Sequence, residues 1–204
     1  MNKQIQLFEK QAKRYSQRSK KKSGDFKLRQ KLLRSAKGDI LEVSVGAGTN
    51  FQFYPKNSNI TAVDFSPSMI EKAKGAAREH GLEVDFIVSN VEDLTLPHKS
   101  YDTVASTLSL CSYPNPEKVL SMLASWCKED GQILLLEHGI SSNGVFSWLQ
   151  NRLDSYYKKK IGCHLNRDII KMVKDAPITI RKHECVMFDS VHLIWATPNR
   201  EEGV

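Results

Sequence analysis

The sequence predicts an α/β protein in which helices cover both faces of a seven-stranded, mostly parallel sheet that ends in an antiparallel hairpin. Two observations support this class. Short apolar runs rich in branched residues alternate with segments of helical periodicity, as in a doubly wound sheet. The last two apolar runs are joined by a connection too short for a crossover helix, so we expect them to pair antiparallel.

Residues 1–37 are predicted to be a basic, helical N-terminal arm. Ile5, Phe8, Ala12 and Tyr15 form one apolar stripe at helical spacing, and a second helix is expected over about residues 25–36. Two interpretations remain open. The helices pack on the sheet, or the first one closes over the ligand pocket as a lid.

The domain itself is predicted from residue 38 to residue 204. Its expected strands are 39–45, 60–64, 84–88, 101–108, 132–136, 178–188 and 191–196. Ser66 and Pro67 are typical of a helix start and Gly81 of a helix stop. A short helix is expected over 49–54, another over 116–128, and a turn at 129–131. Residues 140–176 fall outside the regular alternation, contain a helix near 167–174, and are predicted to be an insertion on the substrate side.

The composition excludes several classes of protein. The 204 residues suit one domain, and no apolar run approaches the roughly 20 residues of a membrane-spanning helix. The N-terminus lacks the apolar core of a secretory signal. The four cysteines form no Cys-x-x-Cys pair, so we expect reduced thiols in a cytoplasmic protein, with no disulfide framework and no metal. They are Cys111, Cys127, Cys163 and Cys185.

The net charge of +7 belongs to the N-terminal arm. Residues 1–37 carry 13 Lys and Arg against two acidic residues, whereas the remaining chain has a net charge of −4. A solvated helix surface, attraction to an anionic membrane surface or substrate, and nucleic-acid binding each explain this excess. The domain has no basic stripe interleaved with aromatic residues, which weighs against nucleic acid.

The predicted site is organised around residues 39–50, Asp-Ile-Leu-Glu-Val-Ser-Val-Gly-Ala-Gly-Thr-Asn. Gly46 and Gly48 let a ligand approach the backbone closely, and Asp64 ends the next strand 18 residues after Gly46. This pairing is typical of a nucleoside site in an open α/β sheet. Phe51 stands where a dinucleotide fingerprint has its third glycine, and Gly-Lys-Ser/Thr is absent. Nicotinamide, flavin and nucleoside triphosphate enzymes are therefore disfavoured.

With Glu42-x-Ser44-x-Gly46-x-Gly48, the sequence resembles the class I S-adenosyl-L-methionine-dependent methyltransferases, over about residues 35–140. The resemblance implies a Rossmann-like fold and S-adenosyl-L-methionine as cofactor, converted to S-adenosyl-L-homocysteine. It also implies the following contacts. At the methionine end, the Gly46–Gly48 backbone would lie against the cofactor with Glu42 beneath it, and Thr107 and Leu108 would line the methyl region. Asp64 would bind the ribose hydroxyls. At the adenine, Phe65 and Met69 would lie along the ring, while Asn90 and the Val91 amide would meet its polar edge.

Within the family, the sequence is most similar to ubiquinone/menaquinone methyltransferases, and also to phosphatidylethanolamine N-methyltransferases and thiol methyltransferases. The similarity implies a small-molecule or lipid-like acceptor. Gln11-Ala-Lys-Arg-Tyr15 resembles a segment whose tyrosine reaches the cofactor carboxylate. The signature of adenine-specific DNA methyltransferases is absent, so we expect no nucleic-acid substrate. The protein is expected in the cytoplasm, either free or peripheral to the inner face of the membrane.

Two positions depart from the family pattern. Ser44 replaces the first glycine, which is tolerable if its φ is negative, and Asn90 replaces the commoner aspartate while keeping a carbonyl acceptor. Ser44 motivates one alternative, a cofactor-binding module without catalysis.

His138, at the end of the fifth strand, is the candidate general base for acceptors that must lose a proton. The alternative is a histidine that is merely hydrogen-bonded at a strand end. Cys111 is expected in the core or the pocket wall. His164 and Arg167 are candidates for contact with an anionic substrate, while helix capping by Asn166 explains that segment equally well.

Overall fold

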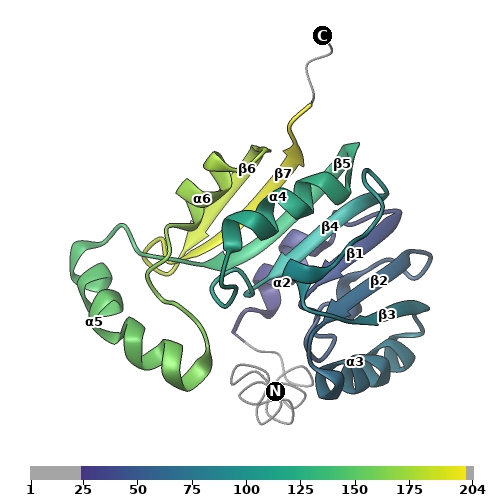
Figure 1. Ribbon diagram of the computed structural model, residues 1–204, viewed down its shortest axis with the longest axis horizontal. Coiled ribbons are helices and arrows are strands. Elements are labelled where there is room, and N and C mark those ends of the chain that lie inside the picture. The colour runs from purple at the N-terminus through teal and green to yellow at the C-terminus, as the bar shows by residue number, and fades with distance from the viewer. Residues whose placement is uncertain (1–23, 201–204) are drawn as a thin grey trace.

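The computed structural model describes residues 24–200 and places all seven strands in one sheet (Figure 1). The strand order is β3-β2-β1-β4-β5-β7-β6, and β7 alone runs opposite to the other six strands. The predicted fold class and the terminal hairpin are thus confirmed. The strands are β1 (Asp39–Val43), β2 (Asn59–Asp64), β3 (Val84–Val88), β4 (Tyr101–Thr107), β5 (Cys127–His138), β6 (Ile178–Val186) and β7 (Val191–Pro198). The first predicted helix and Tyr15 lie outside the described residues.

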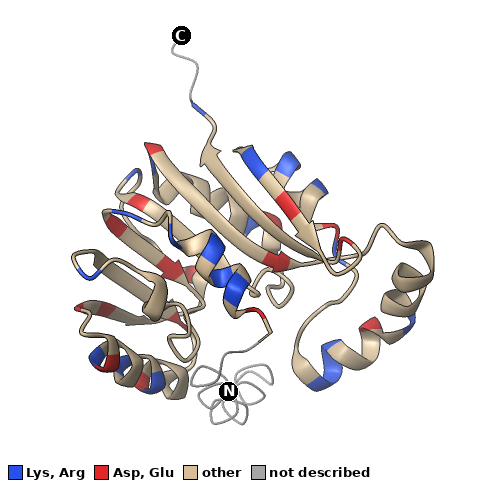
Figure 2. Cartoon of the chain, turned by 180° about the vertical axis from the view of Figure 1, so that it is seen from behind, with Lys and Arg blue, Asp and Glu red and all other residues tan. Residues whose placement is uncertain are grey.

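Helices cover both faces of the sheet because the central strands are apolar on both sides. In β5, Ile133 and Leu135 pack in one hydrophobic cluster, whereas Leu134 and Leu136 pack in the other. The first cluster includes residues of α4 (Pro116–Trp126) and α6 (Ile169–Asp175), and the second includes residues of α2 (Phe26–Leu33) and α3 (Pro67–His80). Figure 2 shows α2, with its Lys and Arg positions coloured blue, lying across the second face.

The boundaries of α3 confirm the sequence prediction. The Ser66 side chain accepts a hydrogen bond from the Met69 amide at 3.1 Å, and Pro67 occupies the first turn. Gly81 ends the helix in the left-handed conformation, with a φ of 64°. The short helix predicted over 49–54 is a single 3₁₀ turn at Phe51–Phe53, and a second such turn, Val91–Asp93, follows β3.

Two predicted connections are wrong. Residues 129–131 form an irregular part of β5 instead of a turn before it, because the register with β4 shifts between Tyr101 and Thr103. The hairpin loop is Met187–Ser190, two residues longer than predicted. Met187, Phe188 and Asp189 all have positive φ, so three left-handed residues make this turn.

Residues 140–176 carry α5 (Gly144–Ile161), which projects from the side of the sheet (Figure 1). Asn143 caps its first turn by accepting hydrogen bonds from the amides of Val145 and Phe146, both at 3.1 Å. Only Gln150 of this helix is buried, so α5 adds little to the core.

Candidate functional site

The glycine turn and the acid of β2 are joined directly. The Gly46 amide donates a hydrogen bond to Asp64 Oδ2 at 2.9 Å, and the Ser66 amide donates to Oδ1 at 2.9 Å. A Cβ on Gly48 would meet the Phe51 ring at 2.9 Å, whereas a Cβ on Gly46 would meet nothing within 4 Å. Gly48 is therefore required for packing, and Gly46 leaves its backbone open to a ligand.

Ser44 replaces the first glycine of the family pattern, which is tolerable only if its φ is negative, and the structure does not meet this condition. Its φ is 51°, in the left-handed region, where a side chain costs roughly 1–2 kcal/mol. The chain has to turn sharply here, because Val45, next in sequence, already donates to the Val63 carbonyl of β2 at 3.0 Å. The Ser44 hydroxyl lies 2.6 Å from the Tyr113 hydroxyl, and this hydrogen bond offsets part of the backbone cost.

Glu42 lies under the turn in a buried polar network. The Asn50 side chain donates hydrogen bonds to Glu42 Oε1 at 2.8 Å and to the Thr107 hydroxyl at 3.0 Å. Arg29 Nη1 in turn donates to the side-chain oxygens of Asn50 and Thr107, at 2.7 and 2.8 Å. Sequence reasoning did not identify Arg29 or Asn50 as site residues. A signal existed, because Arg29 falls at helical spacing between Phe26 and Leu32 on the apolar face of α2.

Burial raises the pKa of Glu42 to about 7. The Tyr54 hydroxyl lies close by, yet within residues 24–200 neither it nor Glu42 Oε2 makes a well-formed hydrogen bond. Buried polar atoms normally have a partner. The contact of Glu42 with the methionine end of S-adenosylmethionine, which the family resemblance implies, stays a prediction.

The predicted adenine-binding residues lie at the same edge of the sheet. The Ser89 amide donates to the Asp64 carbonyl at 3.1 Å, which places Asn90 beside the end of β2. The exposed Asn90 side chain accepts from the Glu92 amide and donates to Asp93 at 2.9 Å. Val91 is buried and Phe65 is half-buried, while Met69 packs against Ala47 of the glycine turn.

The loop after β4 is held by Glu137, a contribution that sequence reasoning missed. Its Oε2 accepts from the amides of Ser109 and Leu110 at 3.0 and 3.1 Å, and Ser106 donates to Oε1 at 2.8 Å. Burial raises the pKa of Glu137 to about 7. Leu108 begins this loop with a φ of 55°, a strained conformation of the kind that clusters at functional sites.

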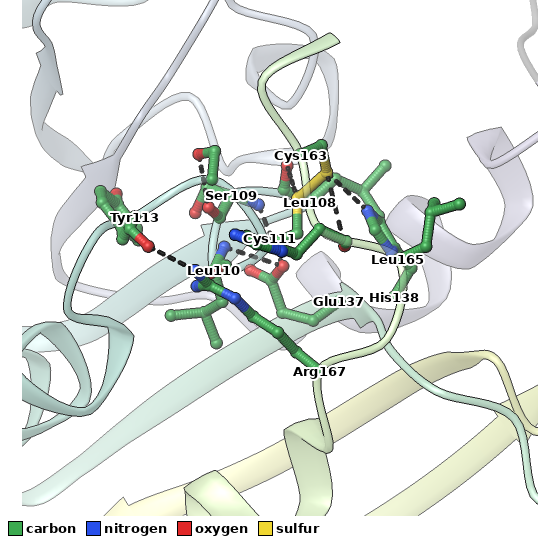
Figure 3. Close-up of a disulfide and its surroundings, with 12 residues drawn as sticks. Leu108, Ser109, Leu110, Cys111, Tyr113, Glu137, His138, Cys163, Leu165 and Arg167 are labelled. Atoms are coloured by element: carbon green, nitrogen blue, oxygen red, sulfur yellow. Dashed lines mark hydrogen bonds between the residues drawn. A yellow bond between two sulfur atoms is a disulfide. The ribbon is translucent and has the colours of Figure 1, made fainter. Parts of the chain in front are cut away.

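His138, Cys111 and Cys163 meet beside this loop (Figure 3). Cys111 and Cys163 form a disulfide with a Cα–Cα distance of 5.1 Å, so the prediction of reduced thiols is wrong for this pair. The fold brings together two residues that are 52 positions apart, which spacing in the sequence does not reveal. Within residues 24–200, Cys127 and Cys185 are the free cysteines.

His138 Nε2 lies 2.9 Å from Cys163 Sγ. Burial, together with the charge of Arg167, lowers the pKa of His138 to about 4, so the imidazole is neutral at neutral pH. A neutral ring can accept a proton, and the role of general base stays a prediction.

The segment before α6 is held by polar contacts within the protein. Arg167 donates to the carbonyls of Leu110 and Tyr113 (Figure 3), and His164 Nδ1 lies 2.9 Å from Asp154 Oδ2. The helix is capped by Asp168, which accepts from the Lys171 amide at 2.9 Å. Capping by Asn166 is therefore wrong.

Comparison with known proteins agrees with this geometry. Residues 41–135, from β1 to β5, match the family described as "Methyltransferase domain". Over these residues the chain belongs to this methyltransferase family. The resemblance carried by Glu42, Gly46 and Gly48 is thereby confirmed, and S-adenosylmethionine is the cofactor of the family.

Several curated proteins are similar to this methyltransferase. A thiol S-methyltransferase, TMT1B of Rattus norvegicus, is 34% identical over 78% of this chain and 63% of its own length. Phosphatidylethanolamine N-methyltransferase of Cereibacter sphaeroides is 26% identical, over 70% of this chain and 71% of its own. A mitochondrial methyltransferase of Saccharomyces cerevisiae, OMS1, is 30% identical over 76% of this chain, which spans only 37% of it.

A solved S-adenosylmethionine-dependent methyltransferase from Clostridium acetobutylicum superposes with a TM-score of 0.63. The match covers 86% of this chain and 90% of that one, at 14% identity, and supports the fold alone.

Proposed function

We propose that this methyltransferase transfers the methyl group of S-adenosylmethionine to a small-molecule or lipid-like acceptor. The observation that carries the proposal is the hydrogen bond between the Gly46 amide and Asp64, which fixes an open backbone beside a buried carboxylate. Relatives named as thiol and phosphatidylethanolamine methyltransferases support an acceptor of this class.

In this proposal each end of the cofactor meets a different strand end. Asp64 orients the ribose, while Asn90 and the Val91 amide hold the adenine. Glu42 faces the methionine end, and Thr107 and Leu108 border the methyl group. Methyl transfer breaks the bond between sulfonium sulfur and methyl carbon as the acceptor attacks in line, so orientation supplies most of the acceleration, on the order of 7–11 kcal/mol.

Two measurements test the proposal in sequence. Calorimetry with S-adenosylhomocysteine detects the cofactor site without any acceptor. Turnover of S-adenosylmethionine is then measured on thiols, amines and quinols. Methylation of one class supports an enzyme, whereas cofactor binding without turnover on all three supports the alternative of a non-catalytic binding module.

A second candidate function is docking on a membrane surface, and α5 favours it. Its apolar side chains Val145, Trp148 and Tyr156 are 80%, 62% and 55% exposed, and Lys158–Lys160 follow them. Phe188, which is 70% exposed and lies 5.9 Å from the Phe146 ring, extends this apolar surface. Aromatic and basic side chains together are typical of helices that lie in the interface of an anionic bilayer. No helix among residues 24–200 is both long and apolar enough to cross a bilayer.

Vesicle flotation tests this docking. We expect the full chain to float with anionic vesicles and less so with zwitterionic ones, and Trp148→Ala to reduce flotation at least about twofold. Val88→Ala, which removes an exposed apolar side chain from β3, is the matched control. If Trp148→Ala and Val88→Ala both float as well as wild type, docking through α5 is contradicted. A separate deletion of residues 1–24 measures the contribution of the basic arm to flotation. Residence in the cytoplasm stays a prediction.

A further inference from the structure

Three soft metal ligands converge at the carboxyl edge of the sheet. Sγ of Cys111, Sγ of Cys163 and a ring nitrogen of His138 all lie within 4.8 Å of one another (Figure 3). They come from the loop after β4, the segment between α5 and α6, and the end of β5. Cys111 is buried, and the other two are half-buried.

Contacts other than the S–S bond position these ligands. Glu137 fixes the loop that carries Cys111 through two of its amides. The His164 amide donates to the Cys111 carbonyl at 3.0 Å, which holds the Cys163 segment against the same loop. His138 is a paired residue of the sheet, opposite Val191. The cluster is thus preorganised by its backbone, as metal sites require.

We propose that Cys111, Cys163 and His138 bind a zinc ion in the reduced protein. Two thiolates balance the charge of Zn²⁺, and a neutral imidazole completes the donor set known from catalytic zinc sites, which leaves a fourth position for water or a substrate atom. Sulfur and imidazole ligands suit zinc and disfavour magnesium and calcium. With Zn–S distances of about 2.3 Å, a tetrahedral ion sets the two sulfurs about 3.8 Å apart, a separation within reach of a χ1 rotation.

The disulfide and the zinc site use the same sulfurs and exclude each other. A dithiol reductant supplies two electrons and two protons to the Cys111–Cys163 bond, yields two thiols and becomes a disulfide itself. Zinc binding then displaces the two thiol protons. The sequence spacing gave no hint of this site, because the fold alone brings the two cysteines together.

The test titrates Zn²⁺ into full-length protein that has been reduced with a dithiol and freed of it under anaerobic conditions. Competition with a chromophoric chelator should give one equivalent with a Kd below about 1 μM, and oxidised protein should bind at least about 100-fold more weakly. Co²⁺ should give a thiolate charge-transfer band and the visible bands of a tetrahedral site. Binding well below one equivalent in the reduced wild-type protein overturns the proposal.

Variants identify the ligands. Cys111→Ser, Cys163→Ser and His138→Gln should each weaken zinc binding at least about tenfold, whereas the matched controls Cys127→Ser and Cys185→Ser should leave it within about twofold. Loss of binding in the controls, or full binding in Cys111→Ser, places the metal elsewhere and contradicts the assignment. Since the reduced and oxidised wild-type forms are compared directly, the test does not depend on any variant folding. Cofactor binding and turnover are separate readouts, so the zinc site and the proposed function can fail independently.

Discussion

The Gly46 amide and Asp64 Oδ2 are 2.9 Å apart, so the glycine turn after β1 and the carboxylate that ends β2 form one rigid unit. Both carboxylate oxygens accept backbone amides, because the Ser66 amide donates to Oδ1. A ribose that binds Asp64 is therefore held in register with the backbone at Gly46.

Replacement of Ser44 by glycine should destabilise the folded protein less than replacement by alanine. Both substitutions remove the hydrogen bond to Tyr113, but only glycine relieves the left-handed backbone at a φ of 51°. We expect Ser44→Gly to be more stable than Ser44→Ala by about 1 kcal/mol in urea unfolding. An alanine variant as stable as the glycine variant would show that this backbone conformation carries no cost.

Arg29 should be essential to the network under the glycine turn. Arg29→Met keeps most of the apolar stem but leaves the side-chain oxygen of Asn50 without its charged donor, and we expect a loss of about 2 kcal/mol in unfolding free energy. Arg34→Met, on the exposed end of α2, should stay within about 0.5 kcal/mol of wild type. Equal effects of the two substitutions would show that the buried guanidinium adds nothing to the free energy of unfolding.

The raised pKa of Glu42 should make stability depend on pH. The folded protein retains this proton up to about pH 7, whereas the unfolded chain loses it near its ordinary value of 4.5. Between these values the folded state binds more protons, so the free energy of unfolding falls as pH rises, by up to about 3 kcal/mol from this group. In urea unfolding measured between pH 4.5 and pH 7, Glu42→Gln should show a smaller fall in the free energy of unfolding than wild type.

The pH dependence of the free energy of unfolding has to be compared between variants, because His138 changes it in the opposite direction. Its pKa is lowered to about 4, so its contribution to stability rises with pH up to about 6.5. Glu79→Gln is the matched control, since Glu79 is an exposed residue of α3. A slope that is identical in wild type and Glu42→Gln would contradict a raised pKa at Glu42.

The sequence was sufficient for the fold because local rules and the fold agree. Alternating apolar runs predict parallel strands, Ser66, Pro67 and Gly81 mark the limits of α3, and the brevity of the last connection predicts an antiparallel pair. Predictions failed where the chain departs from regular geometry. The irregular register of β5 opposite Tyr101 and the three left-handed residues from Met187 have no simple signature.

The candidate site was predictable only where it lies on strand ends. Gly46 and Asp64 follow their strands directly, so the parallel topology alone brings them together. Glu137 and the Cys111–Cys163 pair depend on contacts between segments distant in sequence, which spacing does not encode. Ser44 shows the other limit, because the sign of its φ can be read only from the structure.

The cofactor site is tested most directly by calorimetric titration of S-adenosylhomocysteine into wild type, Asp64→Ala and the exposed control Asp85→Ala of β3. We predict a single site in wild type, an affinity at least about tenfold weaker in Asp64→Ala, equivalent to about 1.4 kcal/mol, and no change in Asp85→Ala. Absence of binding to wild type, or an unchanged affinity in Asp64→Ala, would contradict the site.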